Sequence, residues 1–451
     1  MSTVQDEKDV NRARIEALVE DGQYEEAAAQ VADLHPSDVA DIIEGLDDAQ
    51  RVGLISILPT EQASETLAEM EQGEHRSDLL AALTPEKGAE LIEELADDDA
   101  ADLMGELDVA GQQRILDALP GETAEELIDL LRYDEDTAGG LMTTDLVAVR
   151  GTLNAAEALE QVRLQGREVG DFYTVFVVDH ARRLLGTLRL DDLVIADPES
   201  KIAAIVEDLV ATVGPEEDQE EVGRLIARYN LAAIPVVSPE GILLGRITFD
   251  DVIDVIEAEQ TEDILRLAGV SDEDELRHRW TQSVRVRLPW LALNLLTASA
   301  AASVILMFEE VIDQIITLAF LAPIIAAMGG SSGTQSLAIT IRRLAVEGSG
   351  SARGFVLKEI LIGLVIGGVL GVGIALLALL VEGDPMLGLV VMLAMWVNQI
   401  VAGFAGAFVP ATLDRIGVDP SVASSVFVHT LTDLCGFFLL LGLASKFLLA
   451  N

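Results

Sequence analysis

Hydrophobic positions in the first third of the chain recur in units of about twelve residues. Most units open with a polar residue or proline, and each continues as a short amphipathic helix and closes on Leu or Met. The units tile residues 35 to 131 and read HPSDVADIIEGL, DDAQRVGLISIL, PTEQASETLAEM, EQGEHRSDLLAAL, TPEKGAELIEEL, ADDDAADLMGEL, DVAGQQRILDAL and PGETAEELIDLL. Short helices that cannot bury their apolar faces alone must stack on their neighbours. The pattern therefore predicts an all-α helical repeat domain over residues 1–132, which begins with one or two further helices in residues 1–34.

A different period begins at about residue 141 and continues to about residue 259. Two short β-branched runs, TVFVVD and AAIPVVS, are each followed by a turn, a second strand and a helix. The sequences around them, VVDHARRLLGTLRLDDLV and VVSPEGILLGRITFDDVI, match each other. This internal duplication predicts two β-β-α units, over residues 133–200 and 201–249, that pack together as one pseudo-symmetric α/β module.

Residues 250–283 form a predicted polar helix that connects this module to the rest of the chain. Valine, isoleucine and leucine side chains give it an apolar side. Acidic residues occupy the other side, and they are Asp250, Asp251, Asp254, Glu257, Glu259, Glu262 and Asp263. Like charges three and four positions apart repel one another on a helix. Two interpretations are open, a solvated helix face and a surface that binds cations.

Five long apolar stretches follow, each longer than the roughly 20 residues that cross hydrocarbon. They cover residues 288–308, 314–341, 354–381, 386–413 and 421–449. Basic residues precede the first, third and fifth stretches, and they are Arg277, Arg279, Arg285, Arg287, Arg342, Arg343, Arg353 and Arg415. The alternate connections hold only acidic residues. Because basic residues favour the cytoplasmic side, the pattern predicts an α-helical, multi-pass protein of the cell (plasma) membrane with five spans, cytoplasmic N-terminal domains and the C-terminus outside.

Charge is divided along the chain as sharply as hydrophobicity. The 451 residues are 50% hydrophobic yet carry a formal net charge of −48. Residues 1–283 hold 67 Asp and Glu against 21 Lys and Arg, whereas residues 284–451 hold 10 against 8. An acidic surface repels nucleic acid and attracts cations, so no nucleic-acid partner is expected. The acidic surface typical of a protein from a high-salt habitat is the other interpretation of the excess.

Several kinds of chemistry find no support in the residues. The single cysteine, Cys435, excludes a disulfide within the chain, and the five histidines lack the spacing of zinc ligands. No nucleophile stands beside a base, and no phosphate-binding loop is present. The polar N-terminus has no apolar signal-peptide core, which agrees with a cytoplasmic location. The sequence is not expected to encode an enzyme.

Asp433 lies near the middle of the fifth apolar stretch, where a carboxylate costs very roughly 2.5–3.5 kcal/mol on insertion scales. No Lys or Arg of this stretch lies within three turns, so a cation is the natural partner. His429 and Thr432 are expected near the same helix face. In the second stretch, the glycines and hydroxyls of PIIAAMGGSSGTQS favour a water-filled lining over simple helix packing. Such oxygen ligands suit hard ions, and Mg²⁺ keeps several of its waters when bound.

The whole order of parts resembles the MgtE-type magnesium channel/transporter family, which joins a helical domain, a paired CBS (cystathionine-β-synthase) module, an acidic connecting helix and five spans. The matching segments are YDEDTAGGLMTTDLVAV, IPVVSPEGILLGRITFDDVIDVIEAEQTEDI, GGSSGTQS and GVDPSVASSVFVHTLTDLCG. The resemblance implies a homodimer in the lipid bilayer, a pore at the subunit interface and passive flow of Mg²⁺. Divalent cations are then both the transported and the regulatory ions, with Mg²⁺ the only expected cofactor.

The resemblance also implies roles for individual residues. Asp433 matches the pore aspartate that holds a hydrated Mg²⁺, and the connecting helix matches a "plug" that cytoplasmic Mg²⁺ holds shut. The matching acidic residues are Asp251, Asp254, Glu262 and Asp263 on the plug, Glu65, Asp98 and Asp99 in the helical domain, and Glu220 in the second CBS repeat. The residues expected to line the pore are His429, Ser425, Thr432, Gly329, Gly330 and Ser331.

Some residues depart from the family pattern. The asparagine-rich pore motif reads GGSSGTQ, and His429 stands where a small residue is expected, which opens the question of Co²⁺ and Ni²⁺. Asn230 stands where an acidic CBS ligand is expected. The second repeat keeps a Gly, Thr and Asp pattern for nucleotides, but Asp191 and Thr174 in the first repeat argue against nucleotide binding.

Two other functions are compatible with parts of the pattern. One is a proton-coupled carrier of divalent metals such as Co²⁺ or Ni²⁺, in which Asp433 and His429 exchange protons. The other is a membrane sensor that transports nothing and signals to a partner. Mg²⁺-gated Mg²⁺ conduction for uptake and homeostasis is the function that accounts for most of the features.

Overall fold

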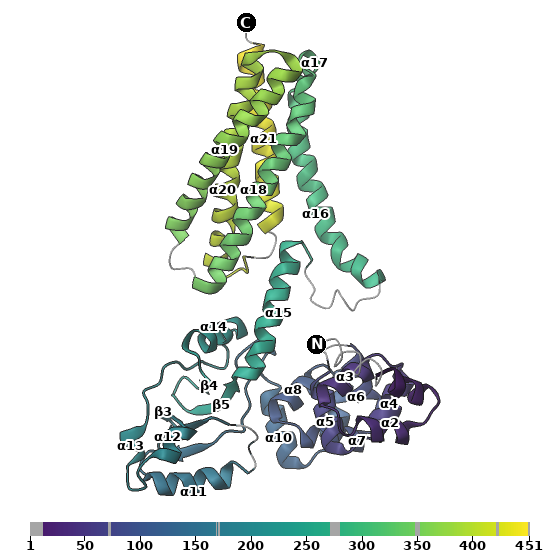
Figure 1. The fold of residues 1–451 in the computed structure, drawn as a ribbon, viewed down its shortest axis with the longest axis vertical. Helices are drawn as coiled ribbons and strands as arrows, with labels where there is room; N and C mark the ends of the chain where they lie inside the picture. The colour runs from purple at the N-terminus through teal and green to yellow at the C-terminus, as the bar shows by residue number, and fades with distance from the viewer. Residues whose placement is uncertain are drawn as a thin grey trace. The chain divides into compact units, whose positions relative to one another are not determined.

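Each twelve-residue unit forms one helix in the computed structural model, which describes residues 12–70, 74–167, 169, 172–270, 280–347, 352–420 and 424–449. The helices are α3 (Pro36–Glu44), α4 (Asp48–Ile55), α5 (Thr60–Ala68), α6 (Glu74–Ala82), α7 (Pro85–Glu94), α8 (Asp97–Gly105), α9 (Val109–Leu116) and α10 (Gly121–Leu130) (Figure 1). A helix over residues 12–20 and α2 (Tyr24–Val31) precede them. The predicted helical repeat domain is therefore confirmed.

Capping side chains fix where these short helices begin. The Asp47 carboxylate accepts the backbone N–H of Gln50 at 2.9 Å, and the Gln50 side chain accepts the N–H of Asp47 at 3.1 Å. At α7 the Thr84 hydroxyl accepts the backbone N–H of Lys87 at 3.3 Å, and Pro85 is at the first helical position. Such caps satisfy N–H groups that have no partner inside the helix. The polar residues that open these two units thus explain where α4 and α7 begin.

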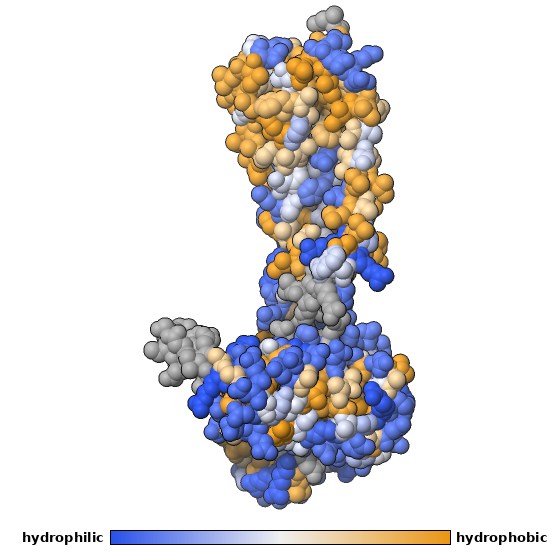
Figure 2. Space-filling model, turned by 90° about the vertical axis from the view of Figure 1, so that its right-hand side faces the viewer, coloured by the Kyte–Doolittle hydropathy of each residue, from blue (hydrophilic) through white to orange (hydrophobic). Residues whose placement is uncertain are grey.

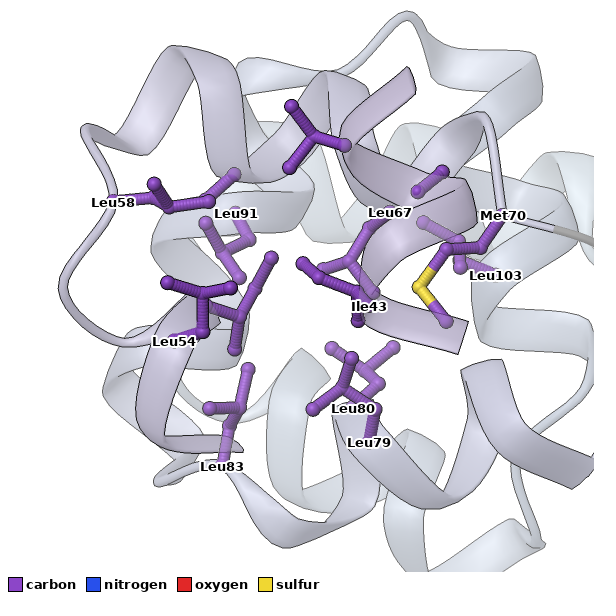
Figure 3. Packing of buried hydrophobic residues seen from close by; sticks show 14 of the residues in the cluster. Ile43, Leu54, Leu58, Leu67, Met70, Leu79, Leu80, Leu83, Leu91 and Leu103 are labelled. Atoms are coloured by element: carbon purple, nitrogen blue, oxygen red, sulfur yellow. The ribbon is translucent and has the colours of Figure 1, made fainter. Parts of the chain in front are cut away.

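Leucine and isoleucine side chains from successive helices share one core. Figure 3 shows Ile43, Leu54 and Leu67 pointing toward one another from α3, α4 and α5, with Leu80 and Leu91 beside them. Ile43, Leu54, Leu67 and Leu91 are fully buried. Burying one such side chain contributes roughly 1.5–3 kcal/mol. Because each helix supplies only a few of these side chains, the helices are stable only as a stack.

The α/β module contains the predicted duplication. The first repeat comprises β1 (Ala148–Arg150), α11 (Ala155–Gln165), β2 (Thr174–Val178), β3 (Leu184–Arg189), α12 (Leu190–Ile195) and α13 (Ile202–Ile205). The second comprises α14 (Gln219–Tyr229), β4 (Ala233–Val237) and β5 (Leu243–Thr248). In both, the antiparallel strands pair with an irregularity at the same place, after Val177 and after Val236. The prediction of β-β-α units omitted β1 and the helices α11 and α14.

Within the first of the two compact units of the chain, Met1–Glu257, the helical domain contacts the second repeat. Ala101 of α8 and Leu130 of α10 belong to the same buried cluster as Val222 and Ile247. At the start of α8, the Asp97 carboxylate accepts a hydrogen bond from the hydroxyl of Thr143 at 2.5 Å. These contacts place the first turn of α8 against the α/β module.

The connecting helix is shorter than predicted. α15 extends over Phe249–Leu267 and does not continue to residue 283. Gly269 has φ +81°, a left-handed conformation that ends a helix and suits glycine. Val252 is buried with Val222 and Ile247, so the first turns of α15 belong to the core of the second repeat. Residues 271–279 of the predicted helix lie outside the described residues.

Five helices in the described ranges are long and apolar enough to cross a membrane, which confirms the predicted number. They are α16 (Trp280–Met307), α18 (Thr317–Glu347), α19 (Ala352–Glu382), α20 (Pro385–Arg415) and α21 (Ser424–Leu448). A short helix, α17 (Glu309–Gln314), joins the first two. α20 packs against α18, α19 and α21 and is the most enclosed of the five. Figure 2 shows hydrophobic side chains over much of the outer surface of these helices, as contact with lipid requires.

The charged residues of this second unit, Ala258–Asn451, gather at opposite ends of its helices. α17 and the C-terminal end of α21 lie at one end, and the last turns of α18 and α20 lie at the other (Figure 1). At the first end, the Thr317 hydroxyl donates a hydrogen bond to Glu382. Arg342, Arg343 and Arg415 occupy the second end. This segregation of charge agrees with the alternation in the sequence.

Candidate functional site

A cavity of about 750 Å³ opens beside the transmembrane helices of the second unit. α18 supplies most of its wall, and α16, α17 and α21 supply the rest. Small and apolar residues dominate, and the lining consists of Ile305, Ile312, Ala319, Ala322, Pro323, Ala326, Ala327, Gly330, Ser331, Thr334, His429, Asp433 and Phe437. Two titratable side chains, His429 and Asp433, therefore face a space large enough for an ion with its water.

Asp433 is the tenth residue of α21, and the residues around it in the helix are mostly apolar. Among the described residues, no Lys, Arg or His lies within ion-pair distance of its carboxylate. A carboxylate in a transmembrane helix is costly unless a cation, a partner or water stabilises it. The geometry therefore leaves the charge of Asp433 to be balanced from the cavity.

The imidazole of His429 lies one turn before Asp433 on the same helix. Its Nδ1 is 2.8 Å from the backbone carbonyl oxygen of Ser425. On the facing helix, a Cβ added at Gly330 would lie 3.0 Å from His429 Cδ2 and 3.3 Å from Nε2. One edge of the ring thus lies against α18 at Gly330, where an added methyl group would displace it by a few tenths of an ångström.

The GGSSGT segment of α18 divides into two faces. Gly330, Ser331 and Thr334 line the cavity. Gly329 and Gly333 face the neighbouring helices instead, because a Cβ at Gly329 would lie 2.3 Å from Asn398 and one at Gly333 would lie 2.5 Å from Val428. α18 is continuous through this segment, so the glycines permit close packing and do not unwind the helix.

Three of the residues predicted to line the pore do not line this cavity. Gly329 belongs to the packing contact just described. Thr432 is fully buried, and its hydroxyl donates to the carbonyl oxygens of Val428 and His429 at 3.0 Å. Ser425 does not line the cavity and contributes the carbonyl oxygen that holds His429. Helical spacing predicted Thr432 near the face of Asp433. Because Thr432 directly precedes Asp433 in α21, its side chain points instead into the contact with α18 and α20.

A second group of candidate residues lies in the first unit, where α8 faces the beginning of α15. Desolvation raises the pKa of Asp98 well above its usual value, and the charges of Asp99 and Asp251 raise it further. Desolvation and the charge of Asp251 raise the pKa of Asp99 to about 6. Desolvation also raises the pKa of Asp251, although the Thr248 hydroxyl hydrogen-bonds to its carboxylate at 2.5 Å. The structure thus brings together three of the predicted regulatory residues, and their charges repel one another.

Two further acidic residues extend this group: Asp102, which was not predicted from the sequence, and Asp254, which was. Desolvation raises the pKa of Asp102 to about 7, against the opposing effect of Arg76 and with a contribution from Asp99. Desolvation and then the charge of Glu69 raise the pKa of Asp254. Asp102 lies three positions after Asp99 in ADDDAADLMGEL, and residues with this spacing are neighbours on a helix. The sequence could therefore have predicted that Asp102 belongs to this group.

The remaining predicted residues lie apart from this group. Glu65 is exposed on α5, and Glu220 is exposed in the first turn of α14. Glu262 lies in the second unit, where it pairs with Arg266, and the side chain of Asp263 is outside the described residues. Asn230, at the C-terminus of α14, has φ 52°, a left-handed conformation that asparagine tolerates well. In the described part of the chain, no three His, Cys, Asp or Glu side chains are arranged to hold a metal ion.

A cavity of about 910 Å³ lies between the two repeats of the α/β module. Its wall includes Thr174, Arg189, Asp191 and Asn230. The Arg189 guanidinium donates to both carboxylate oxygens of Asp191, at 2.9 and 2.7 Å. The positive charge that could meet a phosphate at this place is therefore already paired.

Family models match three parts of the chain. The model described as "MgtE intracellular N domain" matches residues 34–136. The "CBS domain" model matches residues 138–199 and 204–258. The model described as "Divalent cation transporter" matches residues 322–443. Together these models cover the helical domain, both repeats and most of the membrane helices.

Curated relatives match along nearly the whole length. The magnesium transporter MgtE of Thermus thermophilus is 35% identical over 444 residues, which cover 95% of this chain and 97% of that protein. The magnesium transporter MgtE of Enterococcus faecalis is 34% identical over 418 residues, 92% of either chain. The Bacillus subtilis protein of the same name is 29% identical over 437 residues, which cover 96% of this chain and 97% of that one.

Two solved structures resemble the N-terminal part. The soluble part of a magnesium transporter is 30% identical with a TM-score of 0.51, and the match covers 56% of this chain and 99% of that one. The cytosolic domain of the Mg²⁺ channel MgtE in complex with ATP is 36% identical with a TM-score of 0.51, and the match covers 54% and 99%.

Proposed function

Because the chain belongs to the MgtE family of magnesium transporters, we propose that it is a channel that conducts Mg²⁺ past Asp433 and is closed by cytoplasmic Mg²⁺. The observation that carries the proposal is the Asp433 carboxylate, which faces a cavity of about 750 Å³ from the middle of an apolar helix without a basic partner in the described residues. A divalent cation would balance this charge, with which no Lys or Arg of the described residues forms an ion pair.

The lining suits an ion that keeps its water. Ser331 and Thr334 offer hydroxyl oxygens to the cavity beside Asp433, and the other walls are small or apolar. Mg²⁺ dehydrates reluctantly and is usually held through one or two carboxylates plus water. A single carboxylate per chain would gain a second from another copy across a shared axis. We therefore include a homodimer with the pore at its interface in the proposal.

Closure by Mg²⁺ rests on the acidic residues of α8 and α15. After desolvation, the charges of Asp99 and Asp251 raise the pKa of Asp98, and the charge of Asp251 raises the pKa of Asp99. The charges of these residues therefore oppose the packing of α8 against α15. Divalent ions between these carboxylates would remove the repulsion and favour the packed state. Cytoplasmic Mg²⁺ thereby selects one arrangement of the connecting helix, in the manner of a ligand switch.

The proposed location is the cell membrane, with the N-terminal domains in the cytoplasm and the C-terminus outside. The basic ends of α18 and α20 support this orientation, because Lys and Arg favour the cytoplasmic side. The division of charge between the two units supports it as well. Labelling of single cysteines placed at Asp384 and at Arg415, in intact cells, tests it. The proposal expects a membrane-impermeant reagent to reach position 384 and not position 415.

Flux measurements separate a channel from a proton-coupled carrier. In liposomes that contain the purified protein, we expect Mg²⁺ uptake to follow the membrane potential and to ignore an imposed pH gradient. A channel moves ions down their electrochemical gradient without exchanging protons. Uptake that requires a proton gradient would instead support a carrier in which Asp433 and His429 exchange protons with the metal.

A charge-neutralising triple variant tests closure. Replacing Asp98, Asp99 and Asp251 with Asn removes the repulsion together with its ion ligands, so we expect Mg²⁺ current to persist at cytoplasmic Mg²⁺ concentrations that close the wild type. The matched control replaces Glu122, Glu125 and Glu126 of α10, all exposed, with Gln. The control changes the net charge equally and should close normally. Normal closure of the triple Asn variant would refute the proposed mechanism.

Weak nucleotide binding is the expectation for the cavity between the CBS repeats. Asp191 pairs with Arg189 at its wall and places a carboxylate where a phosphate would approach. Like charges at this distance oppose binding. Calorimetric titration of the full-length protein with ATP checks this expectation. ATP is the appropriate nucleotide, because the related cytosolic domain was solved in complex with it. Replacing Asp191 with Asn should strengthen whatever binding is measured.

A further inference from the structure

We propose that His429 Nε2 and the Asp433 carboxylate form a binding site for divalent transition-metal ions such as Co²⁺ and Ni²⁺. The site would hold these ions by direct contact, unlike the hydrated Mg²⁺ of the proposed function. The inference rests on the proposed function in one respect, the access of ions to the cavity. The inference concerns which ions bind in the cavity and whether they contact the protein directly. It is argued from the geometry of the His429 imidazole.

The first observation is the orientation of the ring. His429 Nδ1 lies 2.8 Å from the Ser425 carbonyl oxygen. A carbonyl oxygen can only accept a hydrogen bond, so Nδ1 carries the proton. In the neutral ring, Nε2 therefore keeps its lone pair. Metal-binding histidines usually donate their other N–H to a carbonyl or carboxylate in this way, which fixes the tautomer and the direction of the ring.

The second observation is the position of Nε2. A Cβ placed at Gly330 would lie 3.3 Å from this atom, and Gly330 lines the cavity together with His429 and Asp433. The ring edge that bears Nε2 is therefore held against α18 at the cavity wall. Any side chain larger than hydrogen at position 330 would contact the ring.

The third observation is the spacing of the two ligands. His429 and Asp433 are four residues apart on a continuous helix, so they share a face. Both side chains line the same cavity, which leaves the remaining coordination positions to water and to the hydroxyl of Ser331 or Thr334. One imidazole and one carboxylate on the same helix face can chelate a single ion.

The chemical types of the two ligands determine which ion binds more tightly. Imidazole nitrogen suits Co²⁺, Ni²⁺ and Zn²⁺, whereas Mg²⁺ prefers oxygen ligands and keeps its water. Ions bound directly leave more slowly than hydrated ions held at a distance. Conduction requires an ion to leave its site readily, so a transition-metal ion at His429 and Asp433 would also compete with Mg²⁺ for the cavity.

Titration with Co²⁺ tests the site without any flux measurement. Purified full-length protein in detergent is titrated by calorimetry, and the visible absorption of bound Co²⁺ is recorded. We expect replacement of His429 with Ala to weaken the tightest Co²⁺ binding at least tenfold and to remove the absorption change due to nitrogen ligation. The other four histidines are present in both proteins, so the difference reports His429 alone. Unchanged Co²⁺ affinity in this variant would overturn the proposal.

Two further variants keep the test clear if the His429 variant folds poorly. Gly330→Ala retains both ligands but displaces the ring, and we expect it to weaken Co²⁺ binding. Thr430→Val changes the next residue, whose hydroxyl only donates to the Val426 carbonyl at 2.7 Å, and it should leave Co²⁺ affinity unchanged. Equal Co²⁺ affinity in the Gly330 variant and the wild type would contradict the proposed geometry.

Failure of this site and failure of the proposed function give different results. Mg²⁺ conduction is tested with Asp433→Asn, which retains His429. Loss of Mg²⁺ flux in that variant with unchanged Co²⁺ binding in His429→Ala would support the channel and refute the transition-metal site. The opposite pair of results would refute the channel and support the site.

Discussion

Individual glycines determine how closely the transmembrane helices approach. A Cβ at Gly363 of α19 would lie 2.4 Å from the backbone oxygen of Gln399 in α20, and one at Gly403 would lie 2.5 Å from that of Glu359. Between α18 and α20, a Cβ at Gly406 would lie 2.6 Å from the oxygen of Gly333. These separations permit backbone-to-backbone packing, which small residues provide in membranes. One of these contacts packs α20 against α18, which supplies most of the cavity wall.

Replacing Gly363 with Ala tests this packing. The added methyl group meets backbone atoms that cannot rotate away, so α19 and α20 must separate, at a cost of about 1–3 kcal/mol. We expect the midpoint of thermal unfolding in detergent to fall by several degrees. Gly373→Ala on the same helix is the control, because a Cβ there meets nothing within 4 Å. Equal midpoints for the two variants would contradict the packing described.

At this scale the sequence identified residue types better than residue directions. Asp433 could be predicted as a cation ligand, because a carboxylate in a long apolar stretch needs a partner whatever its neighbours are. The sequence also assigned Gly329 and Thr432 to the pore, although both lie in helix contacts. The direction of a side chain on a transmembrane helix depends on which neighbours enclose it, and an apolar stretch carries little periodicity to show this.

Among the elements, α15 has two environments along its length. Val252 is buried in the core of the second CBS repeat, whereas Arg266 near the other end pairs with Glu262 and with Asp419 of the membrane unit. Acidic residues lie between them. The sequence predicted one longer polar helix, because the pattern does not show where a helix leaves a core. Gly269, with its left-handed φ, was the local signal for the end.

The acidic residues of α8 and α15 predict a pH dependence of their packing. The pKa values of Asp99 and Asp102 are raised to about 6 and about 7, above the usual value of about 3.9. A raised pKa means that the packed state binds more protons than the unpacked state. The resulting stabilisation is complete below pH 4 and is lost as the pH rises through 6 and 7.

Hydrogen exchange of the full-length protein, free of divalent cations, measures this effect. After correction for intrinsic rates, we expect amides of α8 and of residues 249–257 to exchange on the order of tenfold faster at pH 8 than at pH 5.5, which corresponds to ~1.4 kcal/mol. Saturating Mg²⁺ should abolish the difference. A variant with Asn at positions 98, 99 and 102 should show none, and a pH dependence that survives in it would contradict the account.

The ion pairs of Arg266 are expected to stabilise the C-terminal end of α15. Its guanidinium pairs with the carboxylates of Glu262 and Asp419, and its side chain is 30% exposed. Each partly exposed pair contributes up to about 1 kcal/mol. We expect Arg266→Gln to increase hydrogen exchange in residues 258–267 severalfold. The control is Arg163→Gln on α11, where the pair with Glu160 is 65% exposed and should contribute little locally. Unchanged exchange in residues 258–267 would mean that this end is held by other contacts.

At the scale of the whole molecule, two kinds of pattern predicted most of the fold. The internal repeats located the short helices and the duplicated strands, because each copy buries its apolar face against its neighbours in the same way. The long apolar stretches located the membrane helices, since length alone distinguishes them. The helices α11 and α14 were not predicted, because the match between the two repeats lies in their strands and in the helices that follow, and does not include the residues of α11 and α14. The contact between α8 and α15 depends on long-range packing, which no local pattern contains.

Mg²⁺ uptake by Asp433→Asn tests the central claim most directly, since the claim is that this carboxylate balances the ion in the cavity. The measurement compares voltage-driven Mg²⁺ uptake into liposomes that contain equal amounts of wild type, Asp433→Asn and the neighbouring control Thr430→Val. The proposal predicts that uptake by the Asn variant falls at least tenfold while the control conducts like the wild type. Uptake by the Asn variant at the wild-type rate would contradict the assignment of Asp433 to the ion path.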